Sequence, residues 1–68
     1  MNEELFNLDL RKFLKRFGVS AQRELEEAVR KGIETGVLAG KETIRARAKL
    51  EIEGMDVDLV IEENLRIS

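Results

Sequence analysis

The sequence contains no cysteine, histidine, proline, tryptophan or tyrosine. Without cysteine no disulfide forms, and without cysteine and histidine there is no ordinary structural zinc site. Two common ways of stabilising a small protein are thereby excluded. A chain of 68 residues is one domain at most and has room for only a small core. Association with another copy is the remaining way to bury enough apolar surface, and we expect it here.

The same absences restrict the chemistry that the chain performs. Catalytic pairs built on histidine or cysteine cannot exist. Four hydroxyl side chains remain, and the local pattern explains each of them as a helix cap, a helix end, a strand start or a terminal residue: Ser20, Thr35, Thr43 and Ser68. We predict that the protein is not an enzyme and that it holds no cofactor.

Metal and phosphate sites are not predicted either. The four clustered acids Asp56, Asp58, Glu62 and Glu63 include the D-x-D spacing of a calcium loop, but the glycine and the bidentate glutamate of such a loop are missing. We interpret them as a solvated acidic turn and strand face. The segment 40–43, GKET, resembles the end of a phosphate-binding loop only superficially, because no hydroxyl residue follows the lysine directly.

Charge is divided along the chain, although the net charge is only −2. Residues 1–10 carry three acids and no base, residues 11–49 carry eleven bases against five acids, and residues 50–68 carry one base against six acids. The acidic start MNEEL is unlike a signal peptide, and no apolar run is long enough to cross a bilayer. We expect a cytoplasmic protein with no membrane partner.

A first helix is predicted over residues 3–17. Asn2 is a suitable N-cap, and acidic residues follow in the first turn, where the helix dipole favours them. All the aromatic residues of the chain fall on one apolar stripe at helical spacing, which consists of Phe6, Leu10, Phe13 and Phe17. Gly18 is expected to end this helix, because glycine adopts the left-handed conformation without strain.

A second helix is predicted over residues 21–35, with Ser20 as its N-cap and Gly36 as its stop. One of its faces is formed mostly by small residues: Ala21, Leu25, Ala28 and Gly32. A glycine inside a helix costs about 1 kcal/mol relative to alanine. We interpret Gly32 as clearance for the aromatic rings of the first helix, so that the two helices form a helical hairpin with a very short turn.

Two strands, over residues 43–53 and 57–67, are predicted to form an antiparallel β-hairpin. In the first strand apolar and polar residues alternate, so one face is apolar and the other is polar. Residues 53–56 form the turn, and residues 62–64 are interpreted as a bulge or a short turn that interrupts the second strand. The predicted fold class is α+β, a helical hairpin followed by a β-hairpin in one domain of residues 1–68.

A lone hairpin is marginally stable in water and leaves two strand edges open. We therefore expect a homodimer in which two hairpins make a four-stranded sheet. The segment 36–42 would act as a linker that lets the two chains intertwine or exchange elements by domain swapping. The candidate dimer contacts are Leu5, Leu8, Ile44, Leu50, Ile52, Leu59 and Ile61. On this view the protein is a non-enzymatic interaction or regulatory module, whose partners are itself and an unidentified protein.

Binding of nucleic acid is the alternative. A candidate basic surface consists of Arg11, Lys12, Lys15, Arg16, Arg45 and Arg47. Against it, we expect the strand bases to pair across the hairpin with Asp58 and Glu62, and the helix bases to pair with glutamates at helical spacing. A small apolar ligand held between sheet and helices is a third possibility.

Several segments together resemble a family of short bacterial proteins of unknown function. They are Met1-Asn2-Glu3, Phe6-Asn7, Arg11-Lys12-Phe13-Leu14-Lys15, Gly18-Val19, Gln22-Arg23-Glu24, Ala28-Val29-Arg30 and Leu50-x-Ile52-x-Gly54. The resemblance covers nearly the whole chain and is strongest in the first 30 residues. It implies a bacterial cytoplasmic protein with the order helix-helix-strand-strand, and it implies no activity, ligand or catalytic residue.

Overall fold

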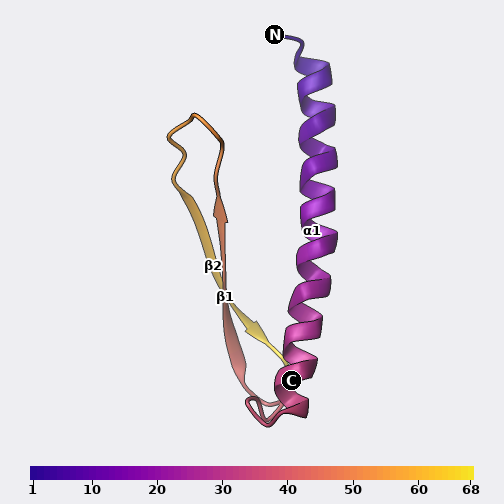
Figure 1. Cartoon of the computed structure of the whole chain (residues 1–68), viewed down its shortest axis with the longest axis vertical. Helices are drawn as coiled ribbons and strands as arrows, with labels where there is room; N and C mark the ends of the chain where they lie inside the picture. Colours follow the sequence, from indigo (N-terminus) through magenta and orange to yellow (C-terminus); the bar gives the residue numbers. More distant parts are fainter. The chain divides into compact units, whose positions relative to one another are not determined.

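The computed structural model describes residues 1–68 and contains one helix followed by two strands. The chain consists of two units, Met1–Val37 and Leu38–Ser68. The first unit holds helix α1, Glu3–Glu34. The second unit holds strands β1, Thr43–Leu50, and β2, Leu59–Arg66, which form a hairpin (Figure 1). The α+β class is thereby confirmed, and the expectation of a single domain over residues 1–68 stays a prediction.

Helix α1 begins as the sequence predicts. The side chain of Asn2 accepts a hydrogen bond from the backbone N–H of Leu5 at 3.1 Å, which satisfies one of the four free N–H groups at the helix start. Glu3 and Glu4 occupy the first turn, where negative charge opposes the helix dipole favourably. The N-cap predicted from Asn2 is therefore confirmed.

The end of α1 is also close to its predicted position. Thr35 is the C-cap, and Gly36 follows with a φ of 83°, in the left-handed region. The backbone N–H of Gly36 donates to the carbonyl of Ile33 at 3.2 Å, and the N–H of Thr35 donates to Lys31 at 3.0 Å. These bonds satisfy carbonyl groups that the last turn would leave free, and a residue with a Cβ would be strained at Gly36.

The prediction of two helices is wrong, because α1 runs for 32 residues without a break at Gly18 or Ser20. Gly18 does not have a positive φ, so it does not act as a helix stop. A glycine inside a helix costs only about 1 kcal/mol, whereas ending one helix and starting another frees backbone groups at both new ends. Good helix formers lie at residues 14–16 before Gly18 and at residues 21–28 after it, and no proline forces a break.

In the hairpin, β1 and β2 pair antiparallel from Thr43 opposite Arg66 to Leu50 opposite Leu59. Residues directly opposite each other share a face of the sheet. One face therefore carries Ile44, Ala46, Ala48 and Leu50 of β1 with Leu59, Ile61, Glu63 and Leu65 of β2. The predicted alternation of an apolar and a polar face is confirmed.

Both strands are shorter than predicted, since β1 stops at Leu50 and β2 begins at Leu59. In the loop between them the N–H of Met55 donates to the carbonyl of Ile52 at 3.2 Å, and Gly54 has a φ of 76°. A glycine with positive φ at the third position is typical of a type II turn, so the predicted turn is present. The predicted interruption at residues 62–64 is wrong, because all three residues pair with β1 in continuous register.

No residue of the chain is buried. Each unit thus has well-defined local structure, with caps in the first and a turn and a paired hairpin in the second, but neither unit has a hydrophobic core by itself.

Candidate functional site

The most extensive apolar surface of the chain is the face of α1 that carries the aromatic residues. Phe6, Phe13 and Phe17 are 51%, 55% and 53% exposed, and Leu14 between them is 58% exposed. Large exposed apolar areas of this kind mark surfaces that contact other proteins or membranes. We call this face the aromatic stripe and define it by Phe6, Leu10, Phe13, Leu14 and Phe17.

The aromatic stripe continues into the second half of α1, a feature that the sequence-based prediction of two helices missed. Positions at intervals of eleven residues lie on nearly the same side of an α-helix, because eleven residues complete about three turns. The chain has three such series: Phe6, Phe17 and Ala28; Leu10, Ala21 and Gly32; Leu14 and Leu25. This period is unbroken across Gly18, so the sequence is compatible with a single continuous helix.

The predicted dimer contacts lie in both units. Leu5 and Leu8 are exposed on α1. The register places Leu50 opposite Leu59, and Ile44 and Ile61 lie on the same apolar face of the hairpin. Ile52 lies beyond the end of β1, in the loop, and is 45% exposed. Four of the five predicted hairpin contacts therefore share one surface, and their role in a dimer stays a prediction.

One carboxylate interrupts the apolar face of the hairpin. Glu63 lies opposite Ala46, in the middle of the two strands, and it forms no ion pair. Covering this face with apolar side chains would bury an unpaired charge at a high cost. Any partner that covers the apolar face must therefore leave Glu63 in contact with water or offer it a polar group.

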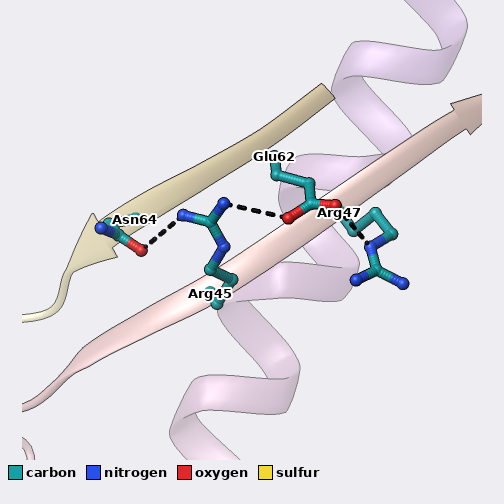
Figure 2. Close-up of polar contacts among 4 residues, drawn as sticks. All are labelled: Arg45, Arg47, Glu62 and Asn64. Atoms are coloured by element: carbon teal, nitrogen blue, oxygen red, sulfur yellow. Dashed lines mark hydrogen bonds and ion pairs between the residues drawn. The ribbon is translucent and has the colours of Figure 1, made fainter. Parts of the chain in front are cut away.

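The opposite face of the hairpin holds a cross-strand cluster of charges (Figure 2). Glu62 of β2 accepts from Arg45 at 2.9 Å and from Arg47 at 3.1 Å, so one carboxylate bridges two guanidinium groups of β1. Arg45 also donates to the side-chain oxygen of Asn64 at 3.0 Å. Each of these exposed ion pairs stabilises the hairpin by less than about 1 kcal/mol.

This cluster shows which residues of the candidate basic surface are already paired within the chain. Arg45 and Arg47 are held by Glu62, as the prediction of pairing across the hairpin requires. Asp58, the other predicted partner, forms no ion pair. Along α1 only Arg30 forms an ion pair, with Glu27, so pairing of the helix bases at helical spacing is confirmed only there. The exposed residues Arg11, Lys12, Lys15 and Arg16 form no ion pair.

The loop before β1 contains a hydrogen-bond arrangement that the sequence did not predict. The carboxylate of Glu42 accepts from the backbone N–H of Ala39 at 2.8 Å and of Lys41 at 3.0 Å. Hydrogen bonding by Ala39, with smaller contributions from other backbone N–H groups of the loop, lowers the pKa of Glu42 below its ordinary value. Gly40, with a φ of 89°, lets the backbone curl around the carboxylate. The N–H groups that a phosphate-binding loop would offer to its ligand here bind a side chain of the same loop.

The remaining surface has no other marked site. No three acidic side chains come together in an arrangement that could hold a metal ion. A hollow at the start of α1, lined by Met1, Asn2, Glu3 and Glu4, is wide open to solvent. Although α1 is long, it is not apolar enough over a sufficient length to span a membrane.

Comparison with known protein families gives a match over the whole chain. The model of a family described as of unknown function, DUF6494, matches residues 1–68. Neither the curated proteins nor the solved structures contain a match to the chain. The predicted resemblance to a family of unknown function is confirmed, and the helix-helix order that it implied is wrong. The chain belongs to the DUF6494 family, a family of unknown function.

Proposed function

We propose that the protein is a non-enzymatic interaction or regulatory module that acts as a homodimer in the bacterial cytoplasm. The observation that supports this proposal best is the absence of any buried residue within either unit. An isolated helix and an isolated two-stranded hairpin are both marginal in water, because neither buries enough apolar surface to offset its ordering entropy. A second copy of the chain supplies the apolar surface that each unit needs as a partner.

The open edges of the hairpin support the same proposal. Ile67 donates to the carbonyl of Glu42 at 3.2 Å, and bonded pairs alternate with non-bonded pairs along an antiparallel ladder. In the observed register, the backbone groups of Arg45, Arg47 and Lys49 therefore face outward from β1. Those of Val60, Glu62, Asn64 and Arg66 face outward from β2. Each row offers a template for another strand.

Charge favours the β2 edge for pairing between copies. If two β1 edges paired antiparallel, Arg45, Arg47 and Lys49 of one copy would face the same three residues of the second copy. Like charges directly opposite each other are destabilising. Two β2 edges centred near Asn64 bring Glu62 against Arg66 of the second copy instead. The four-stranded sheet of this proposal has the order β1-β2-β2-β1, with the two β2 strands in the centre.

The finer elements of the proposal concern exchange and location. The segment 36–42 joins the two units, so a dimer in which each copy exchanges one unit with the other requires no change in either unit. The absence of cysteine gives no evidence for secretion. The apolar hairpin residues Ile44, Leu50, Leu59 and Ile61 are the contacts that we assign to the dimer. Leu5 and Leu8 lie on the face of α1 that also carries Val19, opposite the aromatic stripe.

Sedimentation velocity and light scattering across nanomolar to micromolar concentrations test the homodimer. We expect a dimer at micromolar concentration and a melting temperature that rises with protein concentration. A monomer whose melting temperature is independent of concentration would overturn the proposal.

A matched pair of proline variants tests the choice of edge. Val60 and Lys49 lie opposite each other, and both backbone N–H groups face outward. Proline at either position costs the hairpin no internal hydrogen bond but blocks one edge. We expect Val60→Pro to weaken dimerisation and Lys49→Pro to leave it unchanged. The reverse result would assign the contact to β1.

Nucleic-acid binding finds no support in the family match or in the geometry. Two of the six residues in its predicted basic surface, Arg45 and Arg47, are occupied by Glu62. Titration with duplex and single-stranded DNA at low salt tests the remaining cations, since a phosphate-binding surface shows steep salt dependence.

A further inference from the structure

The aromatic stripe of α1 has a size gradient along the helix. Bulky residues fill its first half, from Phe6 to Phe17, and small residues dominate its second half, where Ala21, Ala28 and Gly32 occupy the same face. The eleven-residue period keeps this face nearly straight over the helix, a length of about 48 Å at 1.5 Å per residue. A straight face of graded size is complementary to a copy of itself placed in the opposite direction.

We propose that α1 pairs with α1 of a second copy in antiparallel orientation, with the two-fold axis beside residue 19. This inference rests on the proposed homodimer and names its helical contact. In this register four of the five residues of the aromatic stripe meet a smaller residue or one of similar size, whereas Leu14 meets Glu24, whose carboxylate has to reach water at the edge of the contact. The four pairings, each of which occurs twice in the two-fold pair, are Phe6 with Gly32, Leu10 with Ala28, Phe13 with Leu25, and Phe17 with Ala21.

The packing explains Gly32, which otherwise lowers helix stability. A helix position without a side chain allows close approach of the opposite backbone or a large side chain. Phe6 of the second copy lies at that height and is 51% exposed in a single chain. Gly32 supplies the volume that its ring occupies, and Ala28 does the same for Leu10.

Charges beside the stripe agree with this orientation. In an antiparallel pair, residues on one side of the stripe meet the same side of the second helix. Arg16 then lies within a turn of Glu24 of the second copy, which is an attractive pair. Asp9 lies between Glu27 and Lys31 of the second copy, so it favours neither orientation.

A parallel pair is disfavoured by its packing. It would place the phenylalanine rings against one another at one end and Ala28 and Gly32 together at the other, leaving a wide end and an empty end. The antiparallel pair has neither.

Single cysteines test the geometry directly, because the chain contains none of its own. Ser20 lies beside the proposed axis, and Lys31 lies eleven residues further along the same side of the helix. In the antiparallel pair the two Lys31 positions are about 36 Å apart along the axis. Val19 lies at the height of the axis but on the outer face. Under mild oxidation we expect Ser20→Cys to form a disulfide-linked dimer, and Lys31→Cys and Val19→Cys to form none.

The outcomes separate the orientation from the homodimer itself. Equal cross-linking of Ser20→Cys and Lys31→Cys would show a parallel pair and overturn the inference. A dimer by light scattering that cross-links at neither position would also overturn it, while leaving the homodimer in place. A monomer at all concentrations would overturn both.

A size swap tests the register in a second way. Gly32→Phe alone places two rings in one layer, and Phe6→Ala alone leaves a void, so each should weaken dimerisation about tenfold or more. The double variant exchanges large and small residues within the same layer and should recover most of the loss. Val19→Leu on the outer face is the control and should leave the dimer unchanged. Additive losses in the double variant would contradict the register.

Discussion

The helix and the hairpin are each incomplete when taken alone, but they lack different things. α1 satisfies most of its own backbone, from the Asn2 cap to the bonds around Gly36, and leaves mainly a side-chain surface uncovered. The hairpin leaves uncovered both an apolar face and two rows of outward backbone groups. A partner for the helix needs complementary side chains, whereas a partner for the hairpin must also supply hydrogen bonds.

This difference makes the two regions sensitive to different changes. A contact between helices is stabilised by the packing of large side chains, so truncating a ring should lower the free energy of unfolding strongly. The hairpin depends on cross-strand pairs, each of which contributes little on an exposed face. Changes in α1 should therefore outweigh side-chain changes in the hairpin if the aromatic stripe is covered in the working protein.

The largest expected effect comes from Phe17→Ala. If the stripe is covered in the dimer, this change lowers the free energy of unfolding by about 3 kcal/mol, as for a buried ring. Val19→Ala, on the opposite face of the helix, should change it by less than about 1 kcal/mol. Urea denaturation at fixed protein concentration measures both. Equal and small effects would show that the stripe stays exposed.

Two glycines of the same unit should respond to alanine with opposite signs. Gly36 has a φ of 83°, so Gly36→Ala should destabilise the helix end by about 1 kcal/mol. Gly18 lies inside the helix, and no neighbouring atom lies within 4 Å of the place that an alanine methyl group would take. Gly18→Ala should therefore stabilise the helix by about 1 kcal/mol. Thermal denaturation followed by circular dichroism gives the sign of each change. A loss of stability in Gly18→Ala would mean that a partner approaches the backbone there.

A smaller effect is expected in the hairpin. Glu62→Gln removes both ion pairs on the polar face and should lower the free energy of unfolding by less than about 1 kcal/mol. The effect should shrink further in high salt, because the groups are exposed. Glu53→Gln in the loop is the control. A loss of several kcal/mol would show that the cluster is buried against a partner.

The smallest change in stability is expected from Glu42, in the loop before β1. The pKa of Glu42 is lowered in the folded chain by the N–H groups that its carboxylate accepts. As pH falls, Glu42 is therefore protonated in the unfolded chain before it is protonated in the folded chain. Its contribution to the free energy of unfolding is complete above the unfolded pKa and is lost as pH falls through the folded pKa. Glu42→Gln should remove this part of the acid dependence, and Glu53→Gln should retain it. Stability measured by urea denaturation below pH 5 distinguishes the two.

Local signals predicted most of the secondary structure. Asn2 and Gly36 mark the ends of α1, the alternation from Ile44 to Leu50 predicts β1, and Gly54 marks the turn. Each depends on hydrogen bonds or steric limits within a few residues. The same local method failed at Gly18, because a glycine is compatible with both a helix interior and a helix end. It failed at residues 62–64 because a polar residue on an apolar face resembles an interruption.

The candidate surfaces were predicted in part. The apolar face of the hairpin and the pairing of Arg45 and Arg47 with Glu62 followed from alternation and charge. The binding of Glu42 by its own loop did not, since it depends on the path of the backbone around Gly40. The continuity of the aromatic stripe was present in the eleven-residue spacing, which a search confined to two short helices overlooks.

The sequence by itself determined which segments are helical or extended, where α1 and β1 begin, and which side chains share a face, because these depend on neighbours along the chain. Only the three-dimensional structure decided that α1 continues through Gly18 and that Glu62 faces both Arg45 and Arg47. A helix stop depends on the φ that the glycine adopts, and a strand register depends on pairing between segments separated by the loop. Such choices differ by about 1 kcal/mol in local terms, so the whole set of backbone hydrogen bonds decides them.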